Sequence, residues 1–208
     1  MLSEVLIVAS PGRAPRIECV GGVAGRRTDA DTVHLVSAAA TPLGGDTISI
    51  RVVVEAGAVL RVRSAAATMA MPGTVTMESR ATWDLEVYGH LDVDPQPTIV
   101  AGAARHVTST RLTVGQGGTV RLRERVQIGR SQERHGFWSG SMRADADTTP
   151  VLRHRVELGA AAVADDELGA PRACVSELRY PQADFDGAGT MLTLAAGGCL
   201  ATWQGERL

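Results

Sequence analysis

Residues 47–63 read TISIRVVVEAGAVLRVR, a stretch in which apolar and polar side chains alternate on both sides of a short turn. Alternation with a period of two is typical of a β-strand that buries one face. The turn at residues 55–58 contains Gly57, and the alternation continues beyond it at Leu60 and Val62. The stretch therefore predicts a pair of half-buried strands joined by a glycine-containing turn.

The same strand–turn–strand unit recurs along the chain. Residues 85–93 and 112–122 repeat it closely, and residues 156–159 and 192–200 repeat it more loosely. Together with residues 47–63 these make five units at a spacing of roughly 30–40 residues, which is typical of repeat proteins. An all-β sandwich produces similar patterns, so the units predict either stacked coils or a sandwich.

Helical patterns are scarce. Residues 64–71 (SAAATMAM) and 160–168 (AAAVADDEL) are two candidates, and each is followed by Gly and Pro residues that end helices. The predicted fold is all-β, a layered β-helical or sandwich-like arrangement of short strands with one or two short helices. We expect a single domain over residues 1–208, in which residues 1–32 are divergent or poorly ordered.

The charge balance argues against nucleic acid and membrane surfaces as partners. The formal net charge is −2, and all 21 cationic residues are arginine. Only 3% of the residues are aromatic, which leaves few side chains on which unpaired bases could stack. No apolar run reaches the roughly 18 residues needed to span a bilayer.

The cysteines and the first residues predict a cytoplasmic protein. Cys19, Cys174 and Cys199 form no CxxC pair and are odd in number, which indicates a reducing compartment. The apolar residues 5–9 are too few, and lack the basic leader, to be a secretory signal peptide. We therefore expect a soluble cytoplasmic protein.

The most distinctive chemical pattern is HLDVD at residues 90–94. Alternate residues of a strand share a face, so His90, Asp92 and Asp94 are expected on one side and the two apolar residues between them in the core. One imidazole and two carboxylates suit a divalent metal ion such as nickel. A solvated strand face that ends at Pro95 explains the same residues without a metal.

No catalytic motif is recognisable. The chain has no GxxxxGK[ST] loop, for which it lacks any lysine, and no GxGxxG loop in the required context. It also lacks a GxSxG turn, and no cysteine has a plausible histidine partner beside it in the sequence. These observations favour a binding or scaffolding protein over an enzyme.

Four segments, in order, resemble the signature of the UreD/UreH family of urease accessory proteins. They are PLGGD at 42–46, RSAAAT at 63–68, LDVDPQPTI at 91–99 and VQIGR at 126–130, within a region of about residues 33–160. The motif residues in these segments are Gly44, Gly45, Pro95, Gln96, Gly129 and Arg130.

The chain departs from the family pattern in three places. The N-terminal region is shorter and divergent, and Val33 stands where the family has a cysteine before the residue that matches His34. His135-Gly136-Phe137 stands where the family has a Gly-Glu pair. These departures argue against assigning a metal role to those positions.

The resemblance implies a β-rich protein with a helix-like winding of strands. It also implies a urease maturation factor, a scaffold that joins a UreF-like protein and a UreG-like GTPase, docks on apo-urease and assists nickel insertion. It implies no tightly bound cofactor, with nickel present only in transit.

A passage for nickel needs weak, transient ligands rather than a closed cage. The candidate ligands along such a passage are Asp46, Asp92, Glu124 and His90. Arg130 is a candidate ion-pair partner for one of the acids. Asp46 has a second interpretation, as the side chain that caps the turn after Gly44 and Gly45.

Two further functions stay open. A β-rich carbohydrate-active enzyme would need two carboxylates that face one cleft, and Asp92/Asp94 or Asp145/Asp147 are the tempting pairs. A metal-free interaction module would need neither a metal ligand nor a cleft.

Overall fold

The computed structural model describes residues 1–131, 133, 135–163, 170–185, 187 and 189–208, which form seventeen strands and no helix. The first sheet contains β1 (Leu2–Ala9), β2 (Arg16–Val20), β5 (Thr47–Val54), β8 (Glu78–Val87), β11 (Arg105–Val114), β13 (Phe137–Ala146) and β14 (Thr149–Gly159). The second sheet contains β3 (Val23–Asp29), β4 (Thr32–Ser37), β6 (Val59–Ser64), β7 (Thr68–Ala70), β9 (His90–Val93), β10 (Thr98–Val100), β12 (Thr119–Ile128), β15 (Ala173–Tyr180), β16 (Thr190–Thr193) and β17 (Cys199–Gly205). The all-β prediction is confirmed.

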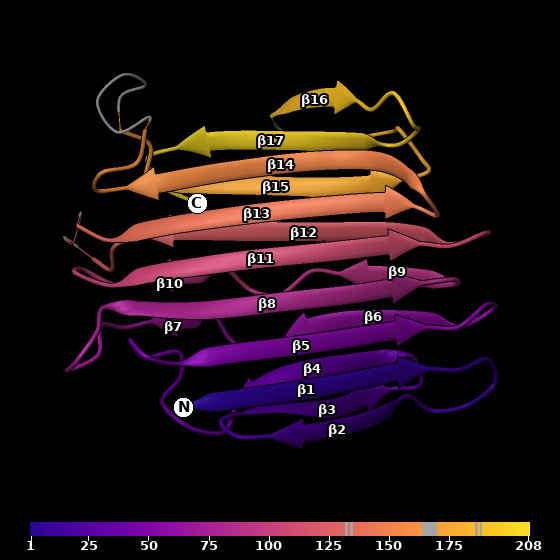
Figure 1. Cartoon of the computed structure of the whole chain (residues 1–208), viewed down its shortest axis with the longest axis horizontal. Helices are drawn as coiled ribbons and strands as arrows, with labels where there is room; N and C mark the ends of the chain where they lie inside the picture. Colours follow the sequence, from indigo (N-terminus) through magenta and orange to yellow (C-terminus); the bar gives the residue numbers. More distant parts are fainter. Residues whose placement is uncertain (132, 134, 164–169, 186, 188) are drawn as a thin grey trace.

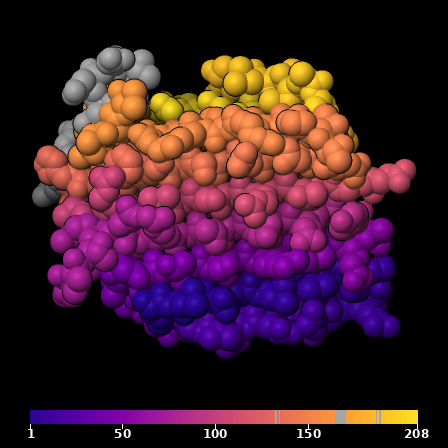
Figure 2. All heavy atoms as spheres, in the orientation of Figure 1, coloured from indigo at the N-terminus to yellow at the C-terminus, as the bar shows by residue number. Residues whose placement is uncertain are grey.

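Three of the five predicted units, at residues 47–63, 85–93 and 112–122, cross from one sheet to the other. Residues 156–159 instead lie within β14, and residues 192–200 join β16 to β17 in the second sheet. β5 lies in the first sheet and β6 in the second, and residues 55–58 form the corner between them. β5 pairs in parallel with β1 and β8, while β6 pairs in parallel with β4 and β9. The units are therefore stacked coils, as in a β-solenoid, and the colours follow this stack in order (Figure 1, Figure 2).

The predicted pairing of two strands within one unit is wrong for these three units, but it is confirmed for residues 192–200, where β16 pairs antiparallel with β17. In the three crossing units, each arm pairs in parallel with the same arm of the neighbouring coil, and the corners stack in the same way. The Tyr88 N–H donates to Val54 O at 2.8 Å, and the Gly115 N–H donates to Val87 O at 2.9 Å. A hairpin and a corner both bury one face of each arm, so alternation alone does not distinguish them.

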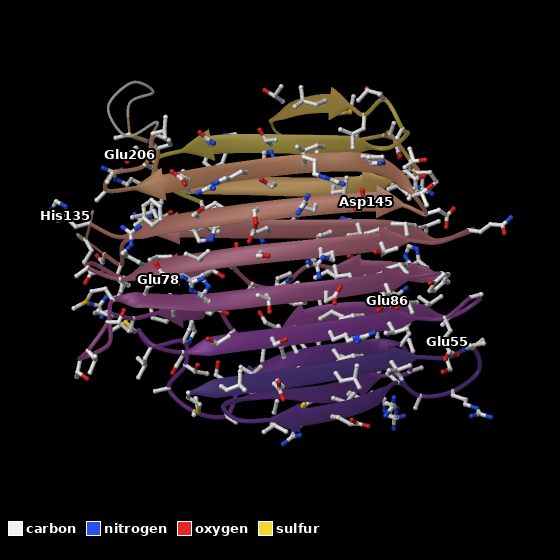
Figure 3. All side chains as sticks on the ribbon, in the orientation of Figure 1. Glu55, Glu78, Glu86, His135, Asp145 and Glu206 are labelled. Atoms are coloured by element: carbon white, nitrogen blue, oxygen red, sulfur yellow. The ribbon has the colours of Figure 1, made fainter. Side chains whose placement is uncertain are left out.

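Parallel stacking brings equivalent ends of the coils together. Glu55, Glu86 and Asp145 lie near the carboxyl ends of their strands in the first sheet and gather at one end of the molecule (Figure 3). Glu78 and His135, near the amino ends of β8 and β13, mark the opposite end (Figure 3). The corners and the longer loops therefore occupy opposite ends of the stack.

The helix predicted at residues 64–71 is wrong, because the segment contains the end of β6 and all of β7. β7 pairs in parallel with β10, and the Thr68 N–H donates to Pro97 O at 3.0 Å. This pairing outweighs the modest helix preference of alanine. Of the second predicted helix, residues 160–163 form turns, and the rest, 164–168, lie outside the described residues.

Residues 1–32, expected to be divergent or poorly ordered, instead contain β1, β2 and β3. β1 pairs in parallel with β5, and β2 pairs antiparallel with β1 as the edge of the first sheet. The N-terminal part of the chain therefore completes both sheets of the stack.

The apolar core between the sheets is divided into two clusters. The larger includes Val54, Leu60, Leu85 and Leu112, near the corners. The smaller lies toward the opposite end and consists of Ala70, Val100, Ala104, Val126, Ile128, Trp138, Leu158 and Cys174. Polar side chains and a cavity separate the two clusters.

Candidate functional site

A cavity of about 320 Å³ lies between the two sheets. The second sheet is interrupted there, because residues 65–67 separate β6 from β7 and residues 94–97 separate β9 from β10. The continuous strand β12 spans both parts, since its first half pairs with β9 and its last residues pair with β10. The interruption leaves room that side chains of the first sheet do not fill.

Inward-facing polar residues of β11 border this cavity. Leu112 and Val114 are buried in the core, so alternation also turns Thr110, Thr108 and His106 inward, and all three are buried. His106 Nδ1 and Ser79 Oγ lie 2.9 Å apart and share a hydrogen bond. Burial lowers the pKa of His106 to about 4, so its imidazole is neutral at pH 7.

Glu124 of β12 also faces the cavity. Its neighbours in the alternation, Leu122 and Val126, are buried in the core. The Thr108 hydroxyl donates to Glu124 Oε1 at 2.8 Å. Burial raises the pKa of Glu124 to about 7, against the opposing effect of this hydrogen bond. Among the described residues that line the cavity, Glu124 is the one carboxylate.

Replacing Glu124 with glutamine should change how stability depends on pH. The folded-state pKa of this acid lies above its ordinary value of 4.5, so folding stabilises its protonated form. Stability is therefore expected to fall as the pH rises from about 4.5 to about 7, and Glu124→Gln should reduce this fall and increase stability above pH 7. Urea denaturation at a series of pH values measures both effects. Identical pH profiles for the two proteins would contradict the prediction.

Cys174 lies near Glu124. Its Sγ is 3.7 Å from the Oγ of Ser176, which pairs with Glu124 across β12 and β15. Burial, together with the nearby Glu124 carboxylate, raises the pKa of Cys174 to about 11. The side chain is therefore a neutral thiol at pH 7.

The family-like motifs line the outer part of the cavity. The small side chains of residues 65–67 are exposed and border it, as do Pro95 and the exposed Gln96. The Gln96 N–H donates to Ser64 Oγ at 2.9 Å and links the two segments. The cavity thus extends from buried Thr108 to exposed residues at the interruption of the second sheet.

Asp46 lies outside the cavity and caps a turn. Its Oδ2 accepts hydrogen bonds from the Thr41 hydroxyl at 2.8 Å and the Leu43 N–H at 2.9 Å, and its Oδ1 accepts one from the Met1 amino group at 2.6 Å. Burial raises the pKa of Asp46, but these hydrogen bonds more than offset it and lower the pKa below its ordinary value. The contacts support the interpretation of Asp46 as a turn cap.

His90 and Asp92 lie on the outer face of the second sheet. The predicted orientation is confirmed, because Leu91 and Val93 are buried while His90 is exposed and Asp92 is half-buried. Asp92 accepts hydrogen bonds from Arg63 at 2.6 Å and from Arg121 at 3.2 Å. His90 Nδ1 lies 2.6 Å from Thr119 Oγ1.

The fold does not bring the four candidate ligands together. Within the part of the chain that the structure describes, no group of three or more His, Cys, Asp or Glu side chains is arranged to hold a metal ion. The predicted pairing of Arg130 with Asp46, Asp92 or Glu124 is wrong. Arg130 is exposed and pairs with Glu133, because the turn at Gly129 has a positive φ of 82° and holds these residues together.

Sequence reasoning missed His106 and Thr108. A signal was present, because the alternation that puts Leu112 inward also puts residues 110, 108 and 106 inward. Polar residues at inward-facing positions of a strand are uncommon, so their presence indicates a candidate site.

Comparison with known proteins identifies the family of this chain. The family described as UreD urease accessory protein matches residues 25–200, beyond the region of the motifs quoted above. A urease accessory protein UreD 1 of Saccharopolyspora erythraea is 40% identical over 140 residues, which is 66% of this chain and 55% of the relative. Urease accessory proteins UreD of Frankia casuarinae and Streptomyces avermitilis are each 36% identical, over 73% and 76% of this chain and 51% and 62% of their own lengths.

The chain spans about half the length of the curated relatives that it matches first. None of its described residues forms a helix that could cross a membrane. The family match covers most of the chain, including the cavity-lining segments from β5 to β12. The chain belongs to the UreD family of urease accessory proteins.

Proposed function

We propose that this chain acts in the cytoplasm as a scaffold for urease maturation. It joins UreF-like and UreG-like proteins, docks on apo-urease and assists the insertion of nickel into the enzyme. Family membership supports the role in maturation. The observation that carries the nickel part is the interior cavity with Glu124 as its carboxylate.

The lining of the cavity suits an ion in transit. One carboxylate, a neutral imidazole and several hydroxyl groups are oxygen and nitrogen ligands that nickel accepts, but they do not form a closed coordination cage. A site of this kind holds a divalent ion weakly and lets it leave. Because nickel competes with the proton on Glu124, weak binding should increase as the pH rises through about 7.

Deleting the gene from a urease-producing host should abolish active urease, and this chain should restore it. The readouts are urease activity and the nickel content of the purified enzyme. Fully nickel-loaded urease in the deletion strain would refute the maturation role.

Glu124→Gln should restore less than about a tenth of the wild-type nickel content, because it removes the charged ligand of the cavity. The matched control is Glu86→Gln, which removes a carboxylate from the outer face of the first sheet and should restore activity fully. If both variants restore nickel equally, the cavity is not the passage.

Equilibrium dialysis with nickel separates this proposal from a metal-free interaction module. Wild type should bind nickel weakly, Glu124→Gln should not, and Asp46→Ala and Asp92→Ala should bind as wild type does, because their carboxylates are already held by other groups. The carbohydrate-active alternative would use Asp92 with Asp94 or Asp145 with Asp147, but Asp92, Asp94 and Asp145 are each paired with arginine.

A further inference from the structure

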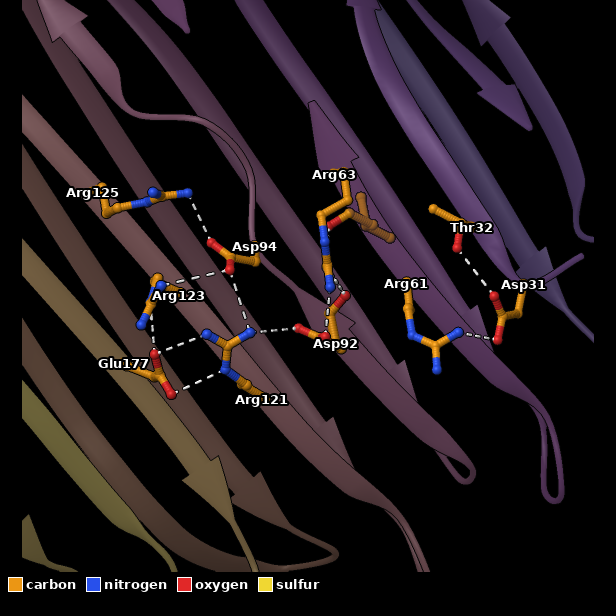
Figure 4. A network of polar contacts seen from close by, with 11 residues as sticks. Asp31, Thr32, Arg61, Arg63, Asp92, Asp94, Arg121, Arg123, Arg125 and Glu177 are labelled. Carbon is orange, nitrogen blue, oxygen red and sulfur yellow. Dashed lines mark hydrogen bonds and ion pairs between the residues drawn. The ribbon is translucent and has the colours of Figure 1, made fainter. Parts of the chain in front are cut away.

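The outer face of the second sheet carries a network of ion pairs (Figure 4). We call it the outer-face network; its members are Arg63, Asp92, Asp94, Arg121, Arg123, Arg125, Glu177 and Arg179. The residues come from β6, β9, β12 and β15 and from the position just after β9. The parallel pairing of β6, β9 and β12 and the antiparallel pairing of β12 with β15 bring these outward positions into one continuous surface.

Arginines outnumber carboxylates on this surface. Even without Arg179, the four arginines of β6 and β12 face three carboxylates, and Arg26 of β3 adds an exposed guanidinium whose contact is the carbonyl of Gly25. The chain as a whole has a net charge of −2. The network thus carries an excess of positive charge on a protein that is slightly negative as a whole.

The guanidinium groups are held in place but not hidden. Arg121 donates to Glu177 at 3.0 Å and to Asp92 at 3.2 Å, and Arg125 donates to Asp94 at 2.8 Å. The side chains of these arginines keep about a quarter of their surface exposed, 26% for Arg121 and 24% for Arg125. Arg125 Nε has no hydrogen-bond partner although it is buried. Fixed guanidinium groups lose little further entropy when a carboxylate binds.

A recess of about 230 Å³ lies beside the network. His90, Arg121 and Arg179 line it together with Asp92 and Asp184. Its size suits a single side chain, and the guanidinium groups of Arg121 and Arg179 at its wall offer charged donors beside the carboxylates of Asp92 and Asp184. The surface therefore has both a charge and a shape that an acidic side chain can match.

The mixture of charges identifies the class of partner. A nucleic acid or an anionic membrane presents negative charge continuously, and the three carboxylates of the network would oppose it. A folded protein presents carboxylates at separate points, which can meet the arginines and avoid the acids. Arginine is also enriched at the centres of protein interfaces.

We propose that the outer-face network is the docking surface for an acidic face of a partner protein. The outer-face network also adjoins the cavity. The Arg125 side chain donates to Pro95 O at 2.6 Å, and Arg123, Arg125 and Pro95 line the cavity. A partner on this surface therefore lies directly over the cavity wall at residues 94–97. The identity of the partner rests on the proposed function, but the docking surface itself does not.

The test compares two double variants that remove the same charge. Arg63→Gln/Arg125→Gln removes two arginines from the network, and Arg51→Gln/Arg111→Gln removes two from the outer face of the first sheet. The probes are the cognate apo-urease and the cognate UreF-like protein, each immobilised in turn. Binding of at least one probe should weaken at least about tenfold for the network variant and less than about twofold for the control. Raising NaCl from 50 to 300 mM should weaken wild-type binding as well.

A single variant, Arg26→Glu, protects the test against misfolding, because Arg26 is exposed on β3 and is not part of the network. It should weaken binding to the same probe by about threefold. Equal effects of the network and control variants, or salt-independent binding, would overturn the proposal. So would network-dependent binding of a 20-nucleotide single strand or of phosphatidylserine vesicles in place of both proteins.

Complementation separates this failure from failure of the proposed function. If the wild-type chain does not restore urease activity, the maturation role is wrong. If wild type and a folded network variant both restore activity and bind the probes equally, only the docking surface is wrong.

Discussion

Replacing Glu177 with alanine should lower the free energy of unfolding by about 3 kcal/mol. The Glu177 side chain is 1% exposed and accepts hydrogen bonds from the Nε atoms of Arg121, Arg123 and Arg179 at 3.0, 2.6 and 2.7 Å. Removing it leaves three guanidinium groups close together without the charge that holds them. Because these groups are partly exposed, solvent reduces the loss to the lower end of the range for buried pairs.

Urea denaturation at pH 7 measures this effect. Glu86→Ala is the control, since Glu86 pairs with Arg51, whose side chain is 56% exposed, and such surface pairs contribute about 0–1 kcal/mol. Equal losses for the two variants would show that the network adds nothing to a surface pair.

The Glu177 carboxylate should also make the free energy of unfolding depend on pH in the acidic range. Burial raises the pKa of Glu177, but the hydrogen bonds and charges of its arginine partners outweigh burial and lower the pKa to about 2. A depressed folded-state pKa stabilises the fold above the ordinary value of 4.5, and this contribution is lost as the pH falls toward about 2. Glu177→Gln should flatten the stability profile in that window.

Replacing Gly44 with valine should abolish folding, with a loss above about 4 kcal/mol. A Cβ atom at this position would lie 1.8 Å from Thr76 O and 2.5 Å from Gly73 N, and both are backbone atoms that cannot rotate away. The contact joins the loops before β5 and β8, because the Gly44 N–H donates to Met71 O at 2.9 Å. The valine side chain would therefore push apart the loops that precede β5 and β8.

Soluble yield and thermal unfolding followed by circular dichroism report the outcome. Gly102→Ala is the control, because a Cβ atom there would meet the Glu133 side chain at an ordinary 3.4 Å, and its effect should stay below about 1 kcal/mol. A Gly44→Val protein that melts near the wild-type temperature would show that these loops separate freely.

Much of the local structure could be predicted from the sequence. Period-two alternation located β5, β6, β11 and β12 and correctly placed Leu91 inward and Asp92 outward. The same rule places Glu124 on the inward face, between the buried Leu122 and Val126. Its depth depends on the gaps between β6 and β7 and between β9 and β10, which no local pattern reveals.

The strand–turn–strand stretch at residues 47–63 shows where the two kinds of information divide. The sequence by itself determined that both arms are strands, which face of each is buried and that a turn separates them, because these properties follow from the order of apolar and polar residues. Only the tertiary structure decided that the turn is a corner between two sheets and that neighbouring coils supply the hydrogen bonds. It also decided that Glu124 borders a cavity while Asp92 joins arginines of β6 and β12. Hydrogen bonds between strands carry no side-chain signature, so the partners of a strand depend on how the whole chain packs.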